Sequence, residues 1–377
     1  MMTWSQVHAR RLLRHGLTAP HANAVEVVAA MAGTHAQVMS AAELAIALRM
    51  KEATRADVRA ALWEDRDLVK TYGPRGTVHL LPARDLDMWV GALSALPPGR
   101  DPMPPEVRMT PEQTEQVLVA IGDALADAEL TADELTEEIV ARTGPWAGDP
   151  VMEAFQGKWP RWRQATALAA FRGVLCFGPT RDRKVTYTNP RRHIPGFRPL
   201  DGTEALARLV PAYLHAYGPS TPQRFAHWLN APVTWAREVF ASLGDALEPV
   251  EVEGASAWVA AGDAEMPEEP PRGVLLLPYF DGYAYRVGNV PPEAMYPGRA
   301  AERVLPANFQ YLVVDGVVAG LWHQRRSGRR IAVTVEPLVP LTAAYRAALD
   351  EQVERVATVL EGRAGLTIGE VTTGGHA

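Results

Sequence analysis

Apolar residues recur along the chain at two spacings, one helical and one alternating. Residues 4–17 and 21–32 carry apolar positions three and four residues apart, which predicts two helices. Ser40, followed three residues later by Glu43, predicts a capping box, so a third helix should begin near Ala41.

The order helix, helix, hairpin then recurs three times, and this is the order of a winged helix-turn-helix. The first copy predicts a helix at 55–64, capped by Thr54, and strands at 68–72 and 77–81. The second copy predicts helices at 111–126, 131–143 and 161–171, the second of them opened by a capping box of Thr131 and Glu134, and strands at 174–177 and 185–187. The third copy predicts a helix at 222–229 capped by Ser220 or Thr221, a helix at 233–243, and strands at 247–252 and 256–260.

From Gly273 onward the pattern changes to strands. We expect them at 274–277, 283–285, 311–314, 317–322 and 331–335, with a tight hairpin turn at Asp315-Gly316 and a last helix at 341–360. The fold class predicted is therefore α+β, with tandem winged helix-turn-helix domains, a small β-rich, barrel-like domain and a C-terminal helix. The expected domains are residues 1–96, 106–198, 202–264 and 272–377, with a Pro-rich linker at 97–105.

Composition narrows the class of protein. The chain has 377 residues, of which 47% are hydrophobic and 22% charged, as in an ordinary globular protein. The single cysteine, Cys176, excludes an internal disulfide and a cysteine-rich metal site. No run is long and apolar enough to span a membrane, and the first residues lack a secretion signal. We expect a cytoplasmic protein with no metal and no cofactor.

The net charge of −6 conceals two basic segments. Residues 158–198 hold ten basic residues and one acidic residue, Asp182, and residues 322–330 hold four basic residues and no acidic one. Trp159, Trp162 and Trp322 lie within these segments. Basic patches beside aromatic residues in an acidic protein favour a polyanionic partner over a merely solvated face.

The triplet His35-Ala36-Gln37 precedes the Ser40 helix and is the strongest candidate for chemistry. In an extended backbone His35 and Gln37 point to one side and Ala36 to the other. An imidazole and a carboxamide can hold one water, which suits a reaction whose leaving group is already activated, such as an N7-alkylated purine. The alternative is a local hydrogen bond from Gln37 at the helix start, with His35 as an ordinary surface residue.

Asp281 follows Pro278-Tyr279-Phe280 near the start of the β-rich segment. It could be a buried acid that serves the site, but the interpretation we favour is a turn-capping aspartate.

Five stretches in order resemble the AlkZ/YcaQ-like bacterial DNA glycosylases, and they cover most of the chain. They are residues 33–48, Arg75-Gly-Thr-Val-His-Leu-Leu-Pro82, Tyr217-Gly-Pro-Ser-Thr221 with Trp228, Leu276-Leu-Pro-Tyr-Phe-Asp281, and Val313-Val-Asp-Gly-Val-Val-Ala-Gly-Leu-Trp322. Relatives carry a catalytic Gln-x-Gln or Gln-x-Asp triplet before this helix. Here the triplet is His35-Ala36-Gln37, which resembles a His-x-Gln branch.

The resemblance implies that His35 and Gln37 are catalytic and that the chain removes bulky N7-alkylguanine adducts, or unhooks cross-links, made by a genotoxic antibiotic. It also implies a DNA-facing hairpin at Arg75, Thr77 and His79. From the basic patches we add further DNA-binding candidates: Arg181, Arg183, Lys184, Arg325 and Arg326. The partner expected is double-stranded DNA carrying alkylated guanine, for a monomer at the nucleoid with no obligate protein partner.

Four lysines and the N-terminus could supply an amine for lyase chemistry, and none lies near the triplet in sequence. We therefore expect a monofunctional glycosylase that uses water. Two alternatives stay open. A winged-helix transcription regulator would bind one operator and leave alkylated DNA unchanged, and a drug-sequestering protein would bind no DNA.

Overall fold

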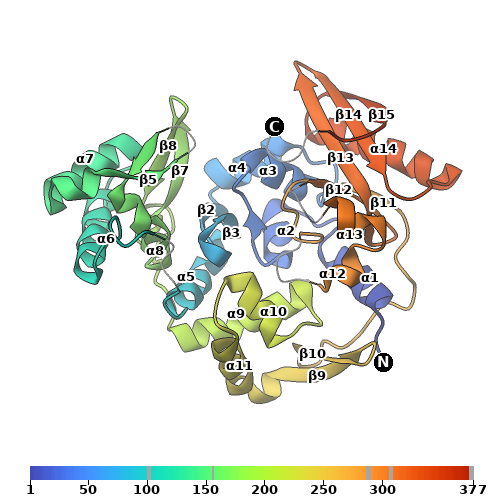
Figure 1. Ribbon diagram of the computed structural model, residues 1–377, viewed down its shortest axis with the longest axis horizontal. Helices are drawn as coiled ribbons and strands as arrows, with labels where there is room; N and C mark the ends of the chain where they lie inside the picture. The colour runs from blue at the N-terminus through green and yellow to red at the C-terminus, as the bar shows by residue number, and fades with distance from the viewer. Residues whose placement is uncertain (100–102, 155–156, 286–289, 305–308, 373–377) are drawn as a thin grey trace. The chain divides into compact units, whose positions relative to one another are not determined.

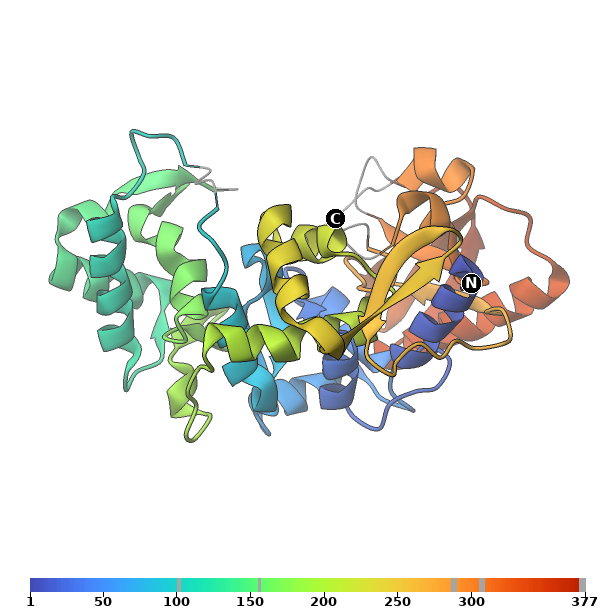
Figure 2. The same cartoon turned by 90° about the horizontal axis from the view of Figure 1, so that it is seen from below.

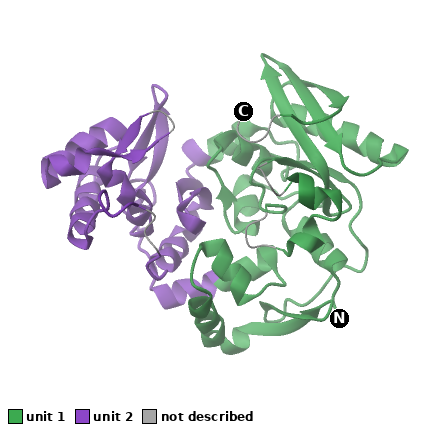
Figure 3. Cartoon of the chain, viewed as in Figure 1, with its two compact units in different colours: residues 1–61, 210–377 green, residues 62–209 purple. Residues whose placement is uncertain are grey.

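The computed structural model describes residues 1–99, 103–154, 157–285, 290–304 and 309–372. The chain forms two compact units (Figure 3). Unit 1 joins residues 1–61 to residues 210–377, and unit 2 is the continuous segment 62–209. The two boundaries fall inside α4 (Arg55–Trp63) and α9 (Gly202–Tyr217). The fold is of the predicted α+β class.

Unit 1 is built on five strands ordered β11-β12-β13-β14-β15, which curl into a half-barrel (Figure 1). Neighbouring strands are antiparallel except for the last pair, which is parallel. The strands are β11 (Val274–Leu277), β12 (Gln310–Val314), β13 (Val317–Ser327), β14 (Arg330–Pro337) and β15 (Arg363–Ile368). The helices α12 (Pro292–Met295), α13 (Arg299–Val304) and α14 (Ala343–Val359) accompany them.

Two sequence predictions for this sheet are wrong. Residues 283–285 are not a strand, because the Asp281 carbonyl accepts the amides of Ala284 and Tyr285 at 3.1 and 2.8 Å and so closes a turn. The last helix does not end the fold, because β15 follows α14 and pairs with β14. A parallel pair needs a crossover, and α14 supplies it. The sequence Arg-Ala-Gly-Leu-Thr-Ile of β15 lacks the β-branched density that would have indicated a strand.

The rest of unit 1 consists of short helices and one hairpin. These elements are α1 (Trp4–Arg14), α2 (Ala24–Ala30), β1 (Thr34–His35), α3 (Met39–Ala47), α10 (Pro222–Leu229), α11 (Val233–Ser242), β9 (Leu247–Val252) and β10 (Ala255–Ala260). Thr221 caps α10 through the Arg224 amide, as predicted. Figures 1 and 2 both show the N-terminus beside the β9–β10 hairpin, where the Met2 amide donates to Glu251 at 3.0 Å.

The described residues of unit 2 form helices and antiparallel strand pairs. Its elements are β2 (Leu68–Tyr72), β3 (Val78–Pro82), α5 (Leu86–Ser94), α6 (Pro111–Leu125), β4 (Leu130–Thr131), α7 (Ala132–Thr143), β5 (Pro150–Glu153), β6 (Lys158–Pro160), α8 (Thr166–Phe171), β7 (Cys176–Arg181) and β8 (Lys184–Thr188). The antiparallel pairs among these strands are β2–β3, β4–β8, β5–β6 and β7–β8. The capping box at Thr131 and Glu134 is confirmed. The helix predicted from Arg161 begins instead as a 3-10 turn, and α8 follows it. Within the expected linker, residues 100–102 lie outside the described residues.

Candidate active site

The predicted triplet begins at His35, the last residue of β1, and continues into the link that leads to α3. Ala36 is 1% exposed, whereas His35 is half-buried and Gln37 is exposed. Ala36 therefore anchors the segment in the core of unit 1, and the polar residues on either side of it are more accessible. This is the alternation expected from the sequence.

The predicted capping box at the start of α3 is wrong. Helix α3 begins at Met39, its N-cap residue is Val38, and no side chain caps it. Glu43 instead receives two hydrogen bonds from Arg59, at 2.6 and 2.9 Å, and is 3% exposed. A charge-assisted pair from α4 thus replaces the local capping bond, because a buried carboxylate needs a cation more than it needs one amide.

Two aromatic side chains from a distant part of the sequence lie against His35. The ring centroid of Phe280 is 4.6 Å from that of His35, and the Tyr285 centroid is 6.1 Å away. Phe280 and Tyr285 contact each other edge to face at 5.3 Å. Phe280 has a φ of 59°, a left-handed conformation that is costly for a bulky residue. The turn after β11 therefore holds Phe280 in place against an opposing backbone preference.

A buried ion pair fixes that turn. Arg49 donates two hydrogen bonds to the carboxylate of Asp281, at 2.8 and 2.7 Å, and both side chains are fully buried. Asp281 also accepts the Tyr283 amide at 3.0 Å, and Arg49 also donates to the Ala45 carbonyl at 2.8 Å. Asp281 therefore caps a turn and is also a buried acid, the two interpretations that the sequence left open. It joins the end of α3 to the segment that carries Phe280.

Arg11 of α1 is a second buried cation in this region, and aromatic rings surround it. Its guanidinium lies 5.2 Å from the Tyr283 ring centroid and 5.7 Å from that of Tyr217. It donates to the Tyr283 carbonyl at 2.9 Å, while burial lowers the pKa of Arg11. The Tyr217 hydroxyl donates to the Met31 carbonyl at 2.7 Å, four residues before His35. Cation–π contacts with Tyr217 and Tyr283 therefore stabilise the buried Arg11 side chain, and with it the support of the triplet.

Two histidines of the same region are buried in neutral form. Burial, together with the charge of Arg11, lowers the pKa of His8 to about 4. The pKa of His15 is lowered well below its usual value by burial first, and then by Arg11 and Arg49. Neither histidine serves as a base near the triplet: His8 contacts the Ala294 carbonyl, and His15 contacts the Ala216 carbonyl.

The first predicted DNA-facing hairpin belongs to unit 2. Arg75 lies in the turn between β2 and β3 with a φ of 63°, and Thr77 donates to the Pro74 carbonyl at 3.0 Å. His79 is 4% exposed, and its Nδ1 lies 2.9 Å from the Thr77 carbonyl oxygen. A Cβ at Gly73 would lie 2.8 Å from His79 Cγ, so only glycine fits beside this ring. Of the three side chains, Arg75 and Thr77 are the more accessible.

The basic turn between β7 and β8 also belongs to unit 2, and we call Arg181, Arg183 and Lys184 the wing-tip cluster. Arg181 forms an ion pair with Glu134, and Lys184 forms one with Asp133 at 2.8 Å. Arg183 is exposed, with a φ of 65° in the turn. Neighbouring carboxylates on α7 therefore offset part of the positive charge that the sequence places here.

The second basic patch lies at the β13–β14 hairpin of unit 1. Arg325 and Arg326 are both exposed residues. Arg326 donates to the Gly328 and Leu360 carbonyls at 2.8 and 2.7 Å, which ties the hairpin to the end of α14. Part of this patch is thus engaged in holding the half-barrel together.

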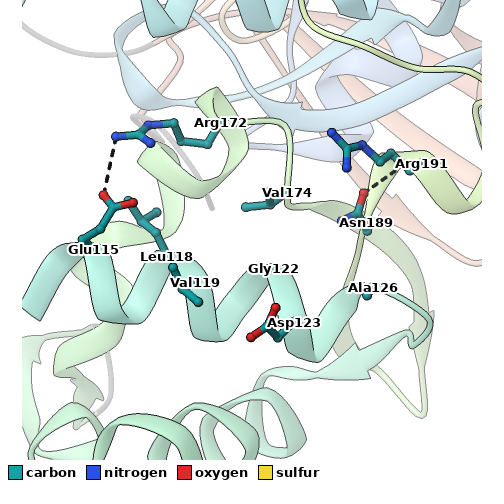
Figure 4. A pocket seen from close by; sticks show the side chains of 10 residues that line it. All are labelled: Glu115, Leu118, Val119, Gly122, Asp123, Ala126, Arg172, Val174, Asn189 and Arg191. Atoms are coloured by element: carbon teal, nitrogen blue, oxygen red, sulfur yellow. Dashed lines mark hydrogen bonds and ion pairs between the residues drawn. The ribbon is translucent and has the colours of Figure 1, made fainter.

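A cavity of about 470 Å³ in unit 2 runs along α6 (Figure 4). Val119, which is 55% exposed, and Val174 give it apolar lining, and Arg172 and Arg191 bring basic groups to it. Arg172 pairs with Glu115 at 3.6 Å. Acidic and basic groups are mixed along this surface, so it does not resemble a polyanion site.

Neither a cluster of metal ligands nor a membrane-spanning helix is present within the described ranges. Among those residues, three or more His, Cys, Asp or Glu side chains nowhere come together as metal ligands would. No helix in the same ranges is long and apolar enough to cross a membrane.

The sequence predicts the triplet but not the residues that support it. Phe280 lies in one of the family-like stretches and Tyr285 in an expected strand, and no pattern indicates the partner of Asp281. Arg49 and Arg11 carried a usable signal, because each lies on an otherwise apolar helical face, where a cation needs a buried partner. The identity of that partner, more than 200 residues away, had no local signal.

Comparison with known proteins gives a consistent result. The family described as "DNA glycosylase AlkZ-like" matches residues 28–359. An interstrand DNA cross-link repair glycosylase of Streptomyces sahachiroi is 32% identical over 339 residues, which covers 85% of this chain and 87% of that protein. The solved structure of the Streptomyces sahachiroi DNA glycosylase AlkZ superposes with a TM-score of 0.82 at 28% identity, over 98% of this chain and 100% of that one. These matches confirm the resemblance seen in the sequence, and the chain belongs to the AlkZ-like family of DNA glycosylases.

Proposed function

We propose that this chain is a monofunctional DNA glycosylase that hydrolyses the N-glycosidic bond of bulky N7-alkylguanine in double-stranded DNA. The observation that carries the proposal is the arrangement of the triplet: buried Ala36 holds half-buried His35 and exposed Gln37, and Phe280 packs on the imidazole. The name of the Streptomyces sahachiroi relative supports unhooking of interstrand cross-links as part of the same activity.

In the proposed reaction His35 and Gln37 position one water. The water oxygen attacks C1′ of the sugar and forms the new C–O bond while the bond from C1′ to the guanine N9 breaks. The bonding electrons leave with the purine, whose positive charge from N7 alkylation is thereby neutralised. The water's proton passes to neutral His35 and then to solvent. The Gln37 carboxamide orients the water and carries no charge.

The lysines support a product with an intact backbone. Lys51 is the lysine of unit 1, and it follows the C-terminal end of α3, whereas the triplet precedes the N-terminal end. A nine-residue helix is about 14 Å long, so no amine of α3 or its flanks can reach a sugar held at the triplet. We therefore propose an abasic product without lyase cleavage.

The remaining parts of the chain are assigned by the same proposal. In this proposal the segments 1–96, 106–198 and 202–264 act as winged helices that hold duplex DNA, and residues 272–377 are the β-rich part that carries Phe280. The proposed DNA contacts are Arg75, Thr77, the wing-tip cluster, Arg325 and Arg326. His79, expected from sequence to be one of them, is 4% exposed and supports the Arg75 hairpin from its buried side instead. A chromosomal substrate puts the enzyme at the nucleoid, as a monomer, where it protects a cell against a genotoxic antibiotic.

The test is a duplex with one defined N7-alkylguanine, followed by mass analysis of the released base and by hot-alkali cleavage. The wild-type protein should release the modified base, and strand scission should require the alkali. Gln37→Ala should slow single-turnover release at least about tenfold with DNA affinity unchanged, a loss of roughly 1.4 kcal/mol of transition-state stabilisation. Gln352→Ala on α14 is the matched control and should retain the wild-type rate. Unmodified DNA bound at one preferred sequence, with no base released, would indicate a transcription regulator instead.

A further inference from the structure

A separate cavity in unit 1 begins one residue beyond Gln37. Val38 and Leu44, at the start of α3, line one side of it. Tyr279, the neighbour of Phe280, lines it as well. Its volume is about 180 Å³, below the roughly 300–1,000 Å³ of sites that enclose drug-sized ligands. The cavity thus adjoins the triplet and has room for one small planar group.

Most of the polar lining of this cavity comes from the half-barrel, and Ser40 of α3 adds a hydroxyl. Gln310, which is 2% exposed, His323 and Gln324 line it. In the described part of the chain, β12 pairs with β13 only as far as Gln310 and Trp322. His323 and Gln324 follow that last pair, at an edge of β13 where neighbours on opposite faces can both border the cavity.

Two polar atoms here are buried without a hydrogen bond. They are Nδ1 of His323 and Oε1 of Gln324. Buried polar atoms are nearly always paired, so two unpaired ones on neighbouring residues that line one cavity call for an explanation. A bound group that supplies hydrogen-bond donors would provide it. Burial, and then the charge of Arg325, lowers the pKa of His323, so its imidazole is neutral at pH 7 and can donate or accept.

The chemistry of this lining matches one edge of a purine. Guanine presents N1–H and N2–H donors beside the O6 acceptor, whereas adenine presents an N6–H donor beside an N1 acceptor. A carboxamide oxygen accepts the guanine donors, and an imidazole can serve O6 as a donor. Enzymes that act on extruded bases use such contacts to the Watson–Crick edge, together with an aromatic wall such as Tyr279 would provide.

We propose that this cavity binds the Watson–Crick edge of the guanine whose glycosidic bond is cleaved, with Gln324 as the residue that selects guanine. The inference rests on the proposed function and adds the determinant of base identity to it. The cavity is too small for a bulky adduct, which stays outside. A closed pocket for the whole adduct is therefore unnecessary, because only the base edge enters.

The first experiment compares two duplexes, one with N7-methylguanine and one with N3-methyladenine, in single-turnover release. Gln324→Leu should lower the guanine rate at least tenfold and the adenine rate less than twofold. Gln324→Glu keeps acceptor oxygens and should retain at least half of the preference for guanine. Gln352→Leu is the control and should leave both rates unchanged. Equal rate ratios in wild-type protein and Gln324→Leu would overturn the proposal.

The second experiment titrates free 7-methylguanine into the protein by calorimetry, with 3-methyladenine as the comparison. Wild-type protein should bind 7-methylguanine, and Gln324→Leu should bind it at least tenfold more weakly. No binding, or equal binding by the two proteins, means that water alone occupies the cavity, and the proposal fails. This measurement needs no turnover, so it tests whether the cavity binds guanine independently of catalysis. A protein that releases no base from DNA would count against the proposed function, and the calorimetry would still test the cavity. Thermal unfolding of each variant confirms folding, and Gln324→Glu carries the test if Gln324→Leu does not fold.

Discussion

Removing the charge of Asp281 should strongly destabilise unit 1. In Asp281→Asn the fully buried guanidinium of Arg49 loses its counter-charge: one carboxylate oxygen becomes an NH2 donor that faces the guanidinium, and the other remains only a neutral acceptor. Breaking a buried ion pair on one side costs about 3–5 kcal/mol, because the remaining charge stays desolvated. For a unit of this size each kcal/mol lowers the Tm by roughly 2–4 °C, so we expect a drop of about 10 °C.

The assay is scanning calorimetry at pH 7.5 with two comparison variants. Glu361→Gln removes the half-exposed partner of Arg55, whose ion pair spans 3.0 Å at the surface, and should cost less than about 1 kcal/mol. The double variant Arg49→Met with Asp281→Asn removes both charges and should recover more than half of the loss. If Asp281→Asn costs no more than Glu361→Gln, the reasoning from buried charge is wrong.

Three further outcomes are expected. Replacing all three residues of the wing-tip cluster by alanine should lower affinity for damaged and undamaged DNA alike. The slope of log affinity against log salt should decrease by the equivalent of fewer than about three phosphate contacts, because two of the cations already have carboxylate partners. An unchanged salt slope in filter binding would remove this cluster from the interface. If neutral His35 accepts the proton, the rate of base release by the wild-type protein should fall on acidification, and His35→Gln should remain active without that fall. Spontaneous depurination is subtracted from each rate. A wild-type rate that holds down to about pH 5 would rule out this role for His35. Stability should decrease between pH 6.5 and about 4, because the unfolded state binds protons that folded His8 and His15 exclude; each should cost about 1.4 kcal/mol at pH 5.5, and equal urea midpoints at pH 7.5 and 5.5 would contradict this.

Local sequence signals predicted most of the secondary structure. The capping box at Thr131 and the helix cap at Thr221 could be predicted from the sequence because each depends on residues within one helical turn. The Asp315-Gly316 turn between β12 and β13 was predicted for the same reason. Elements whose formation depends on a distant partner were mistaken or missed.

Helix α3 and strand β15 show why. The Ser40 and Glu43 pattern has the spacing of a capping box, but Arg59 offers Glu43 two charged bonds and competes successfully for the carboxylate. Strand β15 exists because α14 returns the chain to β14, which no pattern within residues 363–368 indicates. The candidate site divides in the same way. The triplet is contiguous, so a local pattern could suggest it, whereas Phe280 reaches His35 from the β-rich part of the chain.

The division of unit 1 into two segments sets the order in which the chain can fold during synthesis. Arg49 reaches its partner only when Asp281 has been made, and Arg11 reaches its ring contact only with Tyr283. At roughly 5–20 residues per second, the segment 1–61 waits on the order of ten seconds or more before these contacts are possible. Unit 2 is continuous and can form while that segment waits. The N-terminal segment therefore holds its buried arginines in water until late in translation, and a nascent chain stopped before residue 281 has no means of assembling the triplet's support.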